Sequence, residues 1–204
     1  MIAVISYGTS NVGSMLNMLR KVEAPARLAT RPEELAGATK LILPGIGAFD
    51  QGVRALDNLG FSAPIRRLVM EDKVPILGVC LGMQLLAKGS EEGSLPGFGF
   101  IPGRCRRFAS PASAPLKVPH MGWNTLASRR EGSPLLARLG PDARFYFVHS
   151  FHLVCEDPAD VLATTSYGGA FSSMVNRDNV WGAQFHPEKS HRFGMALLKQ
   201  FSEF

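Results

Sequence analysis

The stretch "PILGVCLGMQLL", Pro75 to Leu86, joins an apolar run of strand type to a helical pattern through two glycines and a cysteine. The run "PILGVC" predicts a buried strand, and a helix is expected directly after it, from Leu81 to about Lys88. A cysteine that only packs in a core needs no such setting, because it behaves as a small hydrophobic residue anywhere. The position of Cys80 at this junction therefore raises the question of a reactive thiol.

Strand and helix patterns also alternate through the rest of the first half of the chain. This alternation is typical of a parallel sheet that is covered by helices on both faces. A glycine-rich loop is expected between Pro44 and Ala63. Strands are expected at Ile2–Ser6, Ala26–Thr30 and Lys40–Pro44, and helices at Asn11–Val22, after a capping box of Thr30 and Glu33, and at Ala63–Asp72.

The second half has a different texture. Glycine and proline are frequent from Gly93 to Pro119, which predicts loops, including the segment "SPASAPLKVP". Strand signals follow, and a C-terminal helix is expected from about Ser190 to Phe201. The fold class is therefore α/β, with an open mixed, mainly parallel central sheet flanked by helices and antiparallel strands added in the C-terminal half. The later strands are expected at Arg144–Phe151, Asp160–Tyr167, Phe171–Val175 and Val180–Phe185, with a hairpin turn at Asn176–Asn179.

Composition limits the possible functions. The 204 residues are 46% hydrophobic, which suits a single domain over residues 1–204, and no apolar run reaches the length of a membrane span. A net charge of +5 arises partly from "RCRRF" and Arg129-Arg130, which lack an aromatic platform. A solvated face, or a patch that steers an anionic substrate or docks an acidic protein, is therefore favoured over nucleic-acid binding. The three cysteines are widely spaced, which predicts neither disulfides nor a metal site. We expect a cytoplasmic protein without a cofactor, a bound metal or a membrane partner.

The segment Gly78 to Gly82 has the Gly-x-nucleophile-x-Gly form of an elbow, a sharp strand-to-helix turn that exposes its central side chain. At this place the start of the helix favours the thiolate of Cys80, and the backbone N–H of Leu81 is available to a developing oxyanion. The alternative is a core cysteine at a strand end with incidental glycines.

A nucleophilic cysteine needs a base, and "QFHPEKS" offers His186 after an apolar strand, with Glu188 two residues further on. Pro187 favours an extended chain here, so the strand end can present the imidazole to the thiol while Glu188 holds the second ring nitrogen. A surface turn after a strand is the alternative interpretation.

The segment "LPGIGAF" places Gly45, Ile46 and Gly47 at the end of a predicted parallel strand. Such a segment offers backbone N–H groups to an oxyanion, and sites in open α/β sheets lie at the carboxyl ends of strands. Alone it is equally consistent with an ordinary glycine-rich turn. Together with the cysteine and histidine motifs, it indicates a cysteine hydrolase of an acyl compound.

The motifs "GVCLGMQLL", "LPGIGAF" and "QFHPEKS" resemble those of the class I, triad-type glutamine amidotransferases. Within that family, "VPHMGWN", "YFVHSFH" and "YGTSNVGSM" are similar to the glutaminase subunits of imidazole glycerol phosphate synthases. The resemblance covers essentially the whole chain. It implies hydrolysis of L-glutamine to glutamate and ammonia, and transfer of the ammonia to a phosphate-binding β/α-barrel cyclase subunit in a heterodimer of histidine biosynthesis.

The resemblance also assigns roles to residues. It implies that Cys80 is the nucleophile, His186 the general base and acid, and Glu188 the group that orients the histidine. Ser6 and Phe151 stand where the family often has aspartate and tyrosine. The further implied residues are Gly45, Ile46, Gly47 and Leu81 for the oxyanion, Gln84, His149, Ser150 and Phe151 for the substrate, and His120, Met121, Trp123 and Asn124 for the partner interface.

Three alternatives remain at this point. The chain could be the glutaminase subunit of another synthase, such as anthranilate or pyridoxal phosphate synthase, although Met83 stands where the former would have histidine. It could be a free-standing hydrolase of γ-glutamyl peptides. It could also be a catalytically silent binding module, which would have no physical need for Cys80, His186 and Glu188 together.

Overall fold

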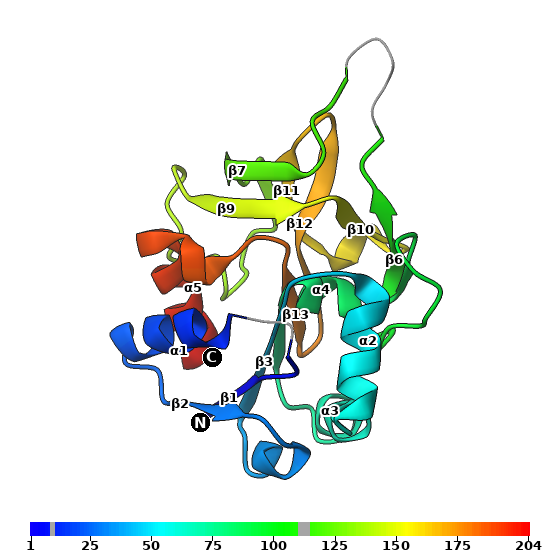
Figure 1. Cartoon of the computed structure of the whole chain (residues 1–204). Coiled ribbons are helices and arrows are strands. Elements are labelled where there is room, and N and C mark those ends of the chain that lie inside the picture. The colour runs from blue at the N-terminus through cyan, green and yellow to red at the C-terminus, as the bar shows by residue number, and fades with distance from the viewer. Residues whose placement is uncertain (9–10, 110–114) are drawn as a thin grey trace.

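The computed structural model describes residues 1–8, 11–109 and 115–204, and within them the chain forms a central sheet with helices on both faces (Figure 1). The strand order of this sheet is β2-β1-β3-β4-β13-β12-β11-β8. The pairs from β2 to β13 are parallel, and the pairs from β13 to β8 are antiparallel. The strands are β1 (Ile2–Ile5), β2 (Ala26–Ala29), β3 (Lys40–Gly45), β4 (Ile76–Cys80), β8 (Ser128–Arg129), β11 (Val161–Ser166), β12 (Ala170–Arg177) and β13 (Val180–Ala183).

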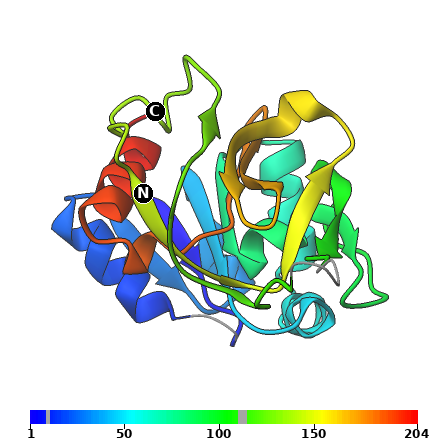
Figure 2. The ribbon, with the colours of Figure 1, turned by 90° about the horizontal axis from the view of Figure 1, so that it is seen from above.

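Two hydrophobic cores form because successive side chains of a strand point to opposite faces of the sheet. Ile2 and Val4 of β1 belong to one core, and Ala3 and Ile5 belong to the other. Figures 1 and 2 show α1 (Val12–Lys21) and α5 (His191–Glu203) on one face, and α2 (Phe49–Asn58) and α3 (Ser62–Met70) on the opposite face. The mainly parallel α/β sheet predicted from the sequence is confirmed.

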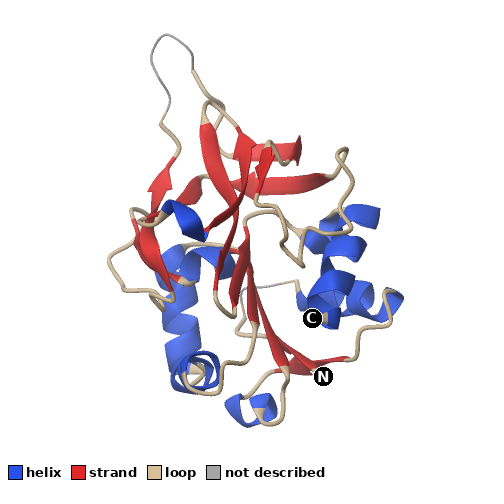
Figure 3. Ribbon diagram, turned by 180° about the vertical axis from the view of Figure 1, so that it is seen from behind, coloured by secondary structure: helices blue, strands red, loops and turns tan. Residues whose placement is uncertain are grey.

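Smaller sheets lie beside the C-terminal half of the main sheet, as the view from behind shows (Figure 3). One pairs β7 (His120–Thr125) with β9 (Arg144–His149), and the other has the order β10-β6-β5. The latter contains β5 (Ala87–Ser90), β6 (Ile101–Arg107) and β10 (Phe151–Cys155). Short 3₁₀ turns complete the structure: η1 (Pro32–Leu35), η2 (Pro158–Asp160) and η3 (Pro187–Lys189).

Several predicted elements need correction. Helix α2 occupies part of the predicted glycine-rich loop, and β6 lies within the region predicted as loops. The helix expected from Leu81 to about Lys88 is the shorter α4 (Leu81–Leu85), because the chain turns into β5. The run Arg144–Phe151 divides at Ser150 into β9 and β10. Residues 110–114 of the predicted loop and residues 9–10 lie outside the described residues.

The predicted capping box has a different membership. Glu34, not Glu33, accepts hydrogen bonds from the backbone N–H groups of Thr30 and Arg31, at 2.6 and 3.1 Å, and the short helix predicted there is the 3₁₀ turn η1. The turn at Asn176–Asn179 does form a hairpin between β12 and β13. The predicted C-terminal helix is also present as α5.

Among the described residues, every helix is too short or too polar to cross a membrane. Over the same ranges, no group of three or more His, Cys, Asp or Glu side chains is arranged to hold a metal ion.

Candidate active site

Cys80 lies at the end of β4 in a strained turn, with φ 54° and ψ −111°, and α4 begins at the next residue. Side chains rarely adopt such a φ, and the cost is of the order of 1–3 kcal/mol. The flanking glycines make the turn possible by close packing. A Cβ on Gly78 would lie 2.7 Å from the carbonyl oxygen of Gly82, and a Cβ on Gly82 would overlap the carbonyl oxygen of Leu43 in β3.

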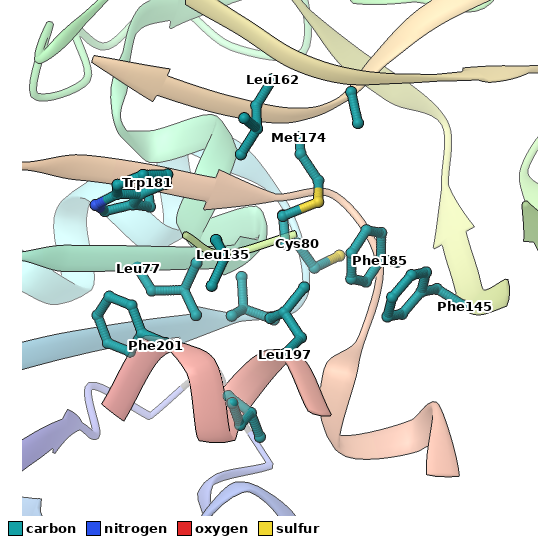
Figure 4. Packing of buried hydrophobic residues seen from close by; sticks show 14 of the residues in the cluster. Leu77, Cys80, Leu135, Phe145, Leu162, Met174, Trp181, Phe185, Leu197 and Phe201 are labelled. Carbon is teal, nitrogen blue, oxygen red and sulfur yellow. The ribbon is translucent and has the colours of Figure 1, made fainter. Parts of the chain in front are cut away.

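The thiol of Cys80 therefore lies at the junction of β4 and α4, against the buried core. Figure 4 shows the side chain among the labelled apolar residues, close to Met174 and Phe185. The residue is 6% exposed, and its Sγ lies 3.9 Å from the carbonyl oxygen of Val148.

His186 follows β13, the neighbour of β4 in the sheet, and its backbone N–H donates to the carbonyl of Tyr146 at 2.9 Å. The ring is 1% exposed. Its Nδ1 lies 2.7 Å from Oε1 of Glu188, a side chain that is itself buried. The carboxylate can only accept, so Nδ1 carries the hydrogen and Nε2 is the free basic nitrogen when the ring is neutral.

Opposing effects act on the pKa of His186. Burial alone would lower it, but the side chains of Cys80 and Glu188 more than offset this and raise the pKa to about 10. Nε2 makes no hydrogen bond of normal geometry with any described residue, yet it lies close enough to Cys80 for the sulfur to contribute to this rise. The arrangement favours a proton on the imidazole.

A pocket of about 300 Å³ opens above Cys80 and His186. It lies at the carboxyl ends of β3 and β4, where Gly45 pairs with Cys80. A larger hollow of about 660 Å³, between η1 and α3, contains neither a cysteine nor a histidine. The smaller pocket is therefore the candidate site, and its lining includes seven further residues singled out from the sequence: Ile46, Gly47, Leu81, Gln84, His149, Ser150 and Phe151.

Polar side chains in the pocket wall form an ordered network. Gln84 donates from Nε2 to the carbonyl oxygen of Phe151 at 3.0 Å and to Oε1 of Gln184 at 3.1 Å. The same carbonyl oxygen lies 2.8 Å from Nδ1 of His149. The Nε2 of His149 is in turn 3.1 Å from Nδ1 of His120.

The whole length of the chain matches known proteins. The family described as "Glutamine amidotransferase class-I" matches residues 3–203. The chain belongs to this family.

Two related proteins align with this chain over its whole length. Imidazole glycerol phosphate synthase subunit HisH of Bdellovibrio bacteriovorus is 48% identical over 204 residues, with 100% of each chain covered. Subunit HisH 2 of Pseudomonas aeruginosa is 48% identical over 203 residues, with 100% of this chain and 99% of the relative covered. Among solved structures, PurLQS from Thermotoga maritima has a similar fold, with a TM-score of 0.72, 19% identity and coverage of 98% of this chain and 94% of that one.

Two polar residues at the candidate site, Glu92 and Gln184, were not predicted from the sequence. Glu92 lines the pocket, and its Oε2 accepts from the backbone N–H of Phe49 at 2.8 Å. No motif or spacing indicates it, because it reaches the pocket only after β5 has turned the chain back. Gln184 is fully buried between Gln84 and Cys80. Its place two residues before His186, on the same face of an extended segment, is a signal that could have identified it.

The segment predicted to face a partner separates into two faces. Met121 and Trp123 are 61% and 45% exposed on β7. His120 is buried at 3% exposure, and Asn124, which lies 3.3 Å from Nε2 of His120, also points inward. A partner can thus contact Met121 and Trp123 directly, whereas His120 belongs to the network behind the pocket.

Proposed function

We propose that this chain is the glutaminase subunit of an imidazole glycerol phosphate synthase, supported by the 48% identity to two relatives that are named as HisH subunits of that synthase. It hydrolyses L-glutamine and delivers ammonia to a β/α-barrel cyclase subunit in a cytoplasmic heterodimer. The cyclase uses the ammonia to make imidazole glycerol phosphate and aminoimidazole carboxamide ribotide in histidine biosynthesis. The observation that carries the proposal is the buried His186, held by Glu188 at 2.7 Å, beside Cys80 in one pocket.

The first half of the reaction forms a thioester. His186 Nε2 takes the proton of Cys80, and the sulfur attacks the side-chain amide carbon of glutamine. Backbone N–H groups of Leu81 and the Gly45–Gly47 segment stabilise the oxyanion. The C–N bond then breaks, and the proton on Nε2 passes to the leaving nitrogen, so ammonia departs and the glutamyl thioester remains.

The second half releases glutamate. His186 removes a proton from water, the resulting hydroxide attacks the thioester, and the C–S bond breaks as the proton returns to sulfur. Glu188 remains an acceptor throughout and stabilises the imidazolium that forms in each half.

The pocket also suits the amino-acid end of glutamine. Gln84 has both amide hydrogens engaged with Phe151 and Gln184, which leaves its oxygen to accept from an ammonium group. The carboxylate of Glu92 adds a negative charge in the same pocket. The segment His149–Phe151 borders the pocket on the other side.

The substitution Cys80→Ser tests the proposal, because it changes little volume but replaces the thiolate with a much weaker nucleophile. We expect glutamine hydrolysis to be lost while circular dichroism and partner binding stay unchanged. Retained hydrolysis in this variant would contradict the role of Cys80.

Supplying ammonium salts at alkaline pH tests the division of labour. The complex of the Cys80→Ser chain with its cyclase should still form product, because the acceptor site lies on the other subunit. A tagged-chain pull-down followed by mass spectrometry identifies that subunit. Failure of ammonia to restore synthesis, or capture of an anthranilate-type synthase instead of a barrel, would overturn the assignment.

A further inference from the structure

Gln184 contacts the sulfur of Cys80 from deep inside the protein. It is 0% exposed and lies just beyond β13, on the segment that continues to His186. Its Nε2 is 3.9 Å from Cys80 Sγ, and its Oε1 accepts from Gln84 at 3.1 Å. A buried amide is costly unless its groups are paired, so both contacts matter to its placement.

A backbone carbonyl fixes the orientation of both amides. The oxygen of Phe151 can only accept, so the atom of Gln84 that faces it at 3.0 Å must be nitrogen. The same nitrogen faces Gln184, whose nearer atom must then be oxygen. The NH₂ group of Gln184 therefore points at Cys80. If the amide of Gln184 were flipped, its NH₂ would face the NH₂ of Gln84, and two donors would stand opposite each other.

This orientation has a consequence when Cys80 loses its proton. As a thiol, Cys80 can donate to the carbonyl oxygen of Val148, 3.9 Å away. As a thiolate it has no hydrogen to donate, and that carbonyl dipole opposes its charge. The N–H of Gln184 is a hydrogen-bond donor directed at the same sulfur, and such donors favour the charged form.

We propose that Gln184 is a positioning residue that aims one N–H at the Cys80 thiolate and, through Gln84, keeps an oxygen directed at the substrate. The inference rests on the proposed role of Cys80 as the nucleophile. It assigns to the buried amide two effects that a space-filling side chain would not have: a lower pH for thiolate formation and a tighter hold on glutamine.

The test is the substitution Gln184→Met, which keeps the length of the side chain and removes its polar groups. The matched control is Gln200→Met, because Gln200 in α5 is also buried, at 4% exposure, and bonds to Leu135, Ala196 and Arg138 away from the pocket. Both variants lose buried amide hydrogen bonds. Thermal melts measure the stability that each variant loses with these hydrogen bonds. Comparison with Gln200→Met then separates this loss of stability from effects at the active site.

The decisive readout is the rate of iodoacetamide alkylation of Cys80 as a function of pH, with the modified peptide identified by mass spectrometry. Burial raises the pKa of Cys105 and, to about 11, that of Cys155, so their reaction is slow and separable. In Gln184→Met we expect the midpoint to rise by about 0.5 to 1 pH unit, a modest shift because the contact is long. We also expect glutamine KM to rise and kcat to fall, each by about three- to ten-fold.

An unchanged alkylation midpoint in a Gln184→Met chain that melts like Gln200→Met would overturn the inference and leave Gln184 a structural residue. If the methionine variant does not fold, Gln184→Leu carries the test, because it also removes the amide N–H without adding a charge beside the sulfur; an unchanged midpoint there has the same meaning. Failure of the proposed function is distinct, since it appears as hydrolysis that survives Cys80→Ser.

Discussion

At the scale of single residues, buried histidines make stability depend on pH in two opposite ways. Burial lowers the pKa of His120 to about 4, and burial is the largest cause that lowers that of His149 to about 3. Between about pH 6.5 and these values the unfolded chain binds more protons, so acidification through this range destabilises the fold. The raised pKa of His186 has the reverse effect, because its contribution is complete below pH 6.5 and is lost as the pH rises towards 10.

We therefore predict a maximum of thermal stability near neutral pH, with decreases on both sides. The substitution His120→Phe keeps the ring stacked near Phe147 and Tyr167 but removes a titrating group. It should lower Tm at pH 7, because His149 and Asn124 lose a partner. It should also make the decrease of Tm between pH 6.5 and 4 shallower.

Calorimetric melts across pH 4–10 measure both effects. An acid limb as steep as in the unsubstituted chain would contradict the assignment, and the alkaline limb serves as the internal control.

Some residues of the candidate site could be predicted from the sequence and others could not. Cys80, His186 and the Gly45–Gly47 segment were predicted together because a nucleophilic thiol needs a base and oxyanion donors, and each of the three stands at the end of a predicted strand. That the strand before His186 runs parallel to β4 is known only from the structure. Glu92 was not predicted, because a carboxylate in a return loop carries no periodic signal. Gln184 was not either, although it shares a face of the extended segment with His186. The inward side chain of His120 depends on the pairing of β7 with β9, which the chain order does not specify.

At the scale of elements, the approach of β3 to the start of α4 limits which residue can stand at position 82. We predict that Gly82→Ala destabilises the fold by about 2–3 kcal/mol, because its Cβ would overlap the carbonyl oxygen of Leu43 and force β3 and the elbow apart. The displaced elbow should also slow alkylation of Cys80. Urea unfolding and the alkylation assay measure these effects.

The matched control is Gly13→Ala in α1, where a Cβ would meet no described atom within 4 Å. There alanine should leave stability unchanged or raise it by up to about 1 kcal/mol, since it is the better helix former. Similar losses of stability in both variants would show that steric contact with β3 is not the reason for glycine at position 82.

Helix α2 and strand β6 were not predicted from the sequence, for the same physical reason. Glycines such as Gly52 favoured a loop prediction, but Gly52 lies within α2. A Cβ at this position would lie 3.2 Å from the side chains of Leu81 and Leu85, so glycine here allows α2 to pack closely against α4. The basic stretch "RCRRF" suggested a solvated face or a patch that attracts an anionic substrate or an acidic protein, and no strand was predicted there. Its first four residues belong to β6, where Ile101, Gly103 and Cys105 are buried and the arginines are exposed. In both cases tertiary contacts decide a local pattern that is ambiguous alone.

At the scale of the whole molecule, the site lies where a rigid scaffold meets an exposed loop. Gly45 is packed tightly, since a Cβ there would overlap the hydroxyl of Tyr7. The next residues are open: Ile46 is 48% exposed, and Gly47 has φ +94°, a conformation that favours glycine. The segment is thus fixed at one end and able to change peptide orientation at the other.

This asymmetry leads to a prediction about the isolated chain, which we expect to hydrolyse glutamine poorly until the cyclase docks and binds its nucleotide. Ammonia released without an acceptor wastes glutamine, so the oxyanion segment is best completed only in the working complex. A missing oxyanion donor lowers kcat by about 10² to 10³, and binding of partner and ligand would have to supply a comparable preference for the active orientation.

Steady-state hydrolysis by the chain alone, with cyclase, and with cyclase plus an acceptor analogue measures the effect. A rise in kcat with little change in KM would place it in the transition state, where an oxyanion donor acts. The exposed Met121 and Trp123 provide a control, because replacing both with alanine should weaken docking and leave the basal rate of the free chain unchanged. Equal kcat/KM in all three conditions would mean that the oxyanion segment is already complete in the free chain, and the openness of Ile46 and Gly47 would then have no part in catalysis.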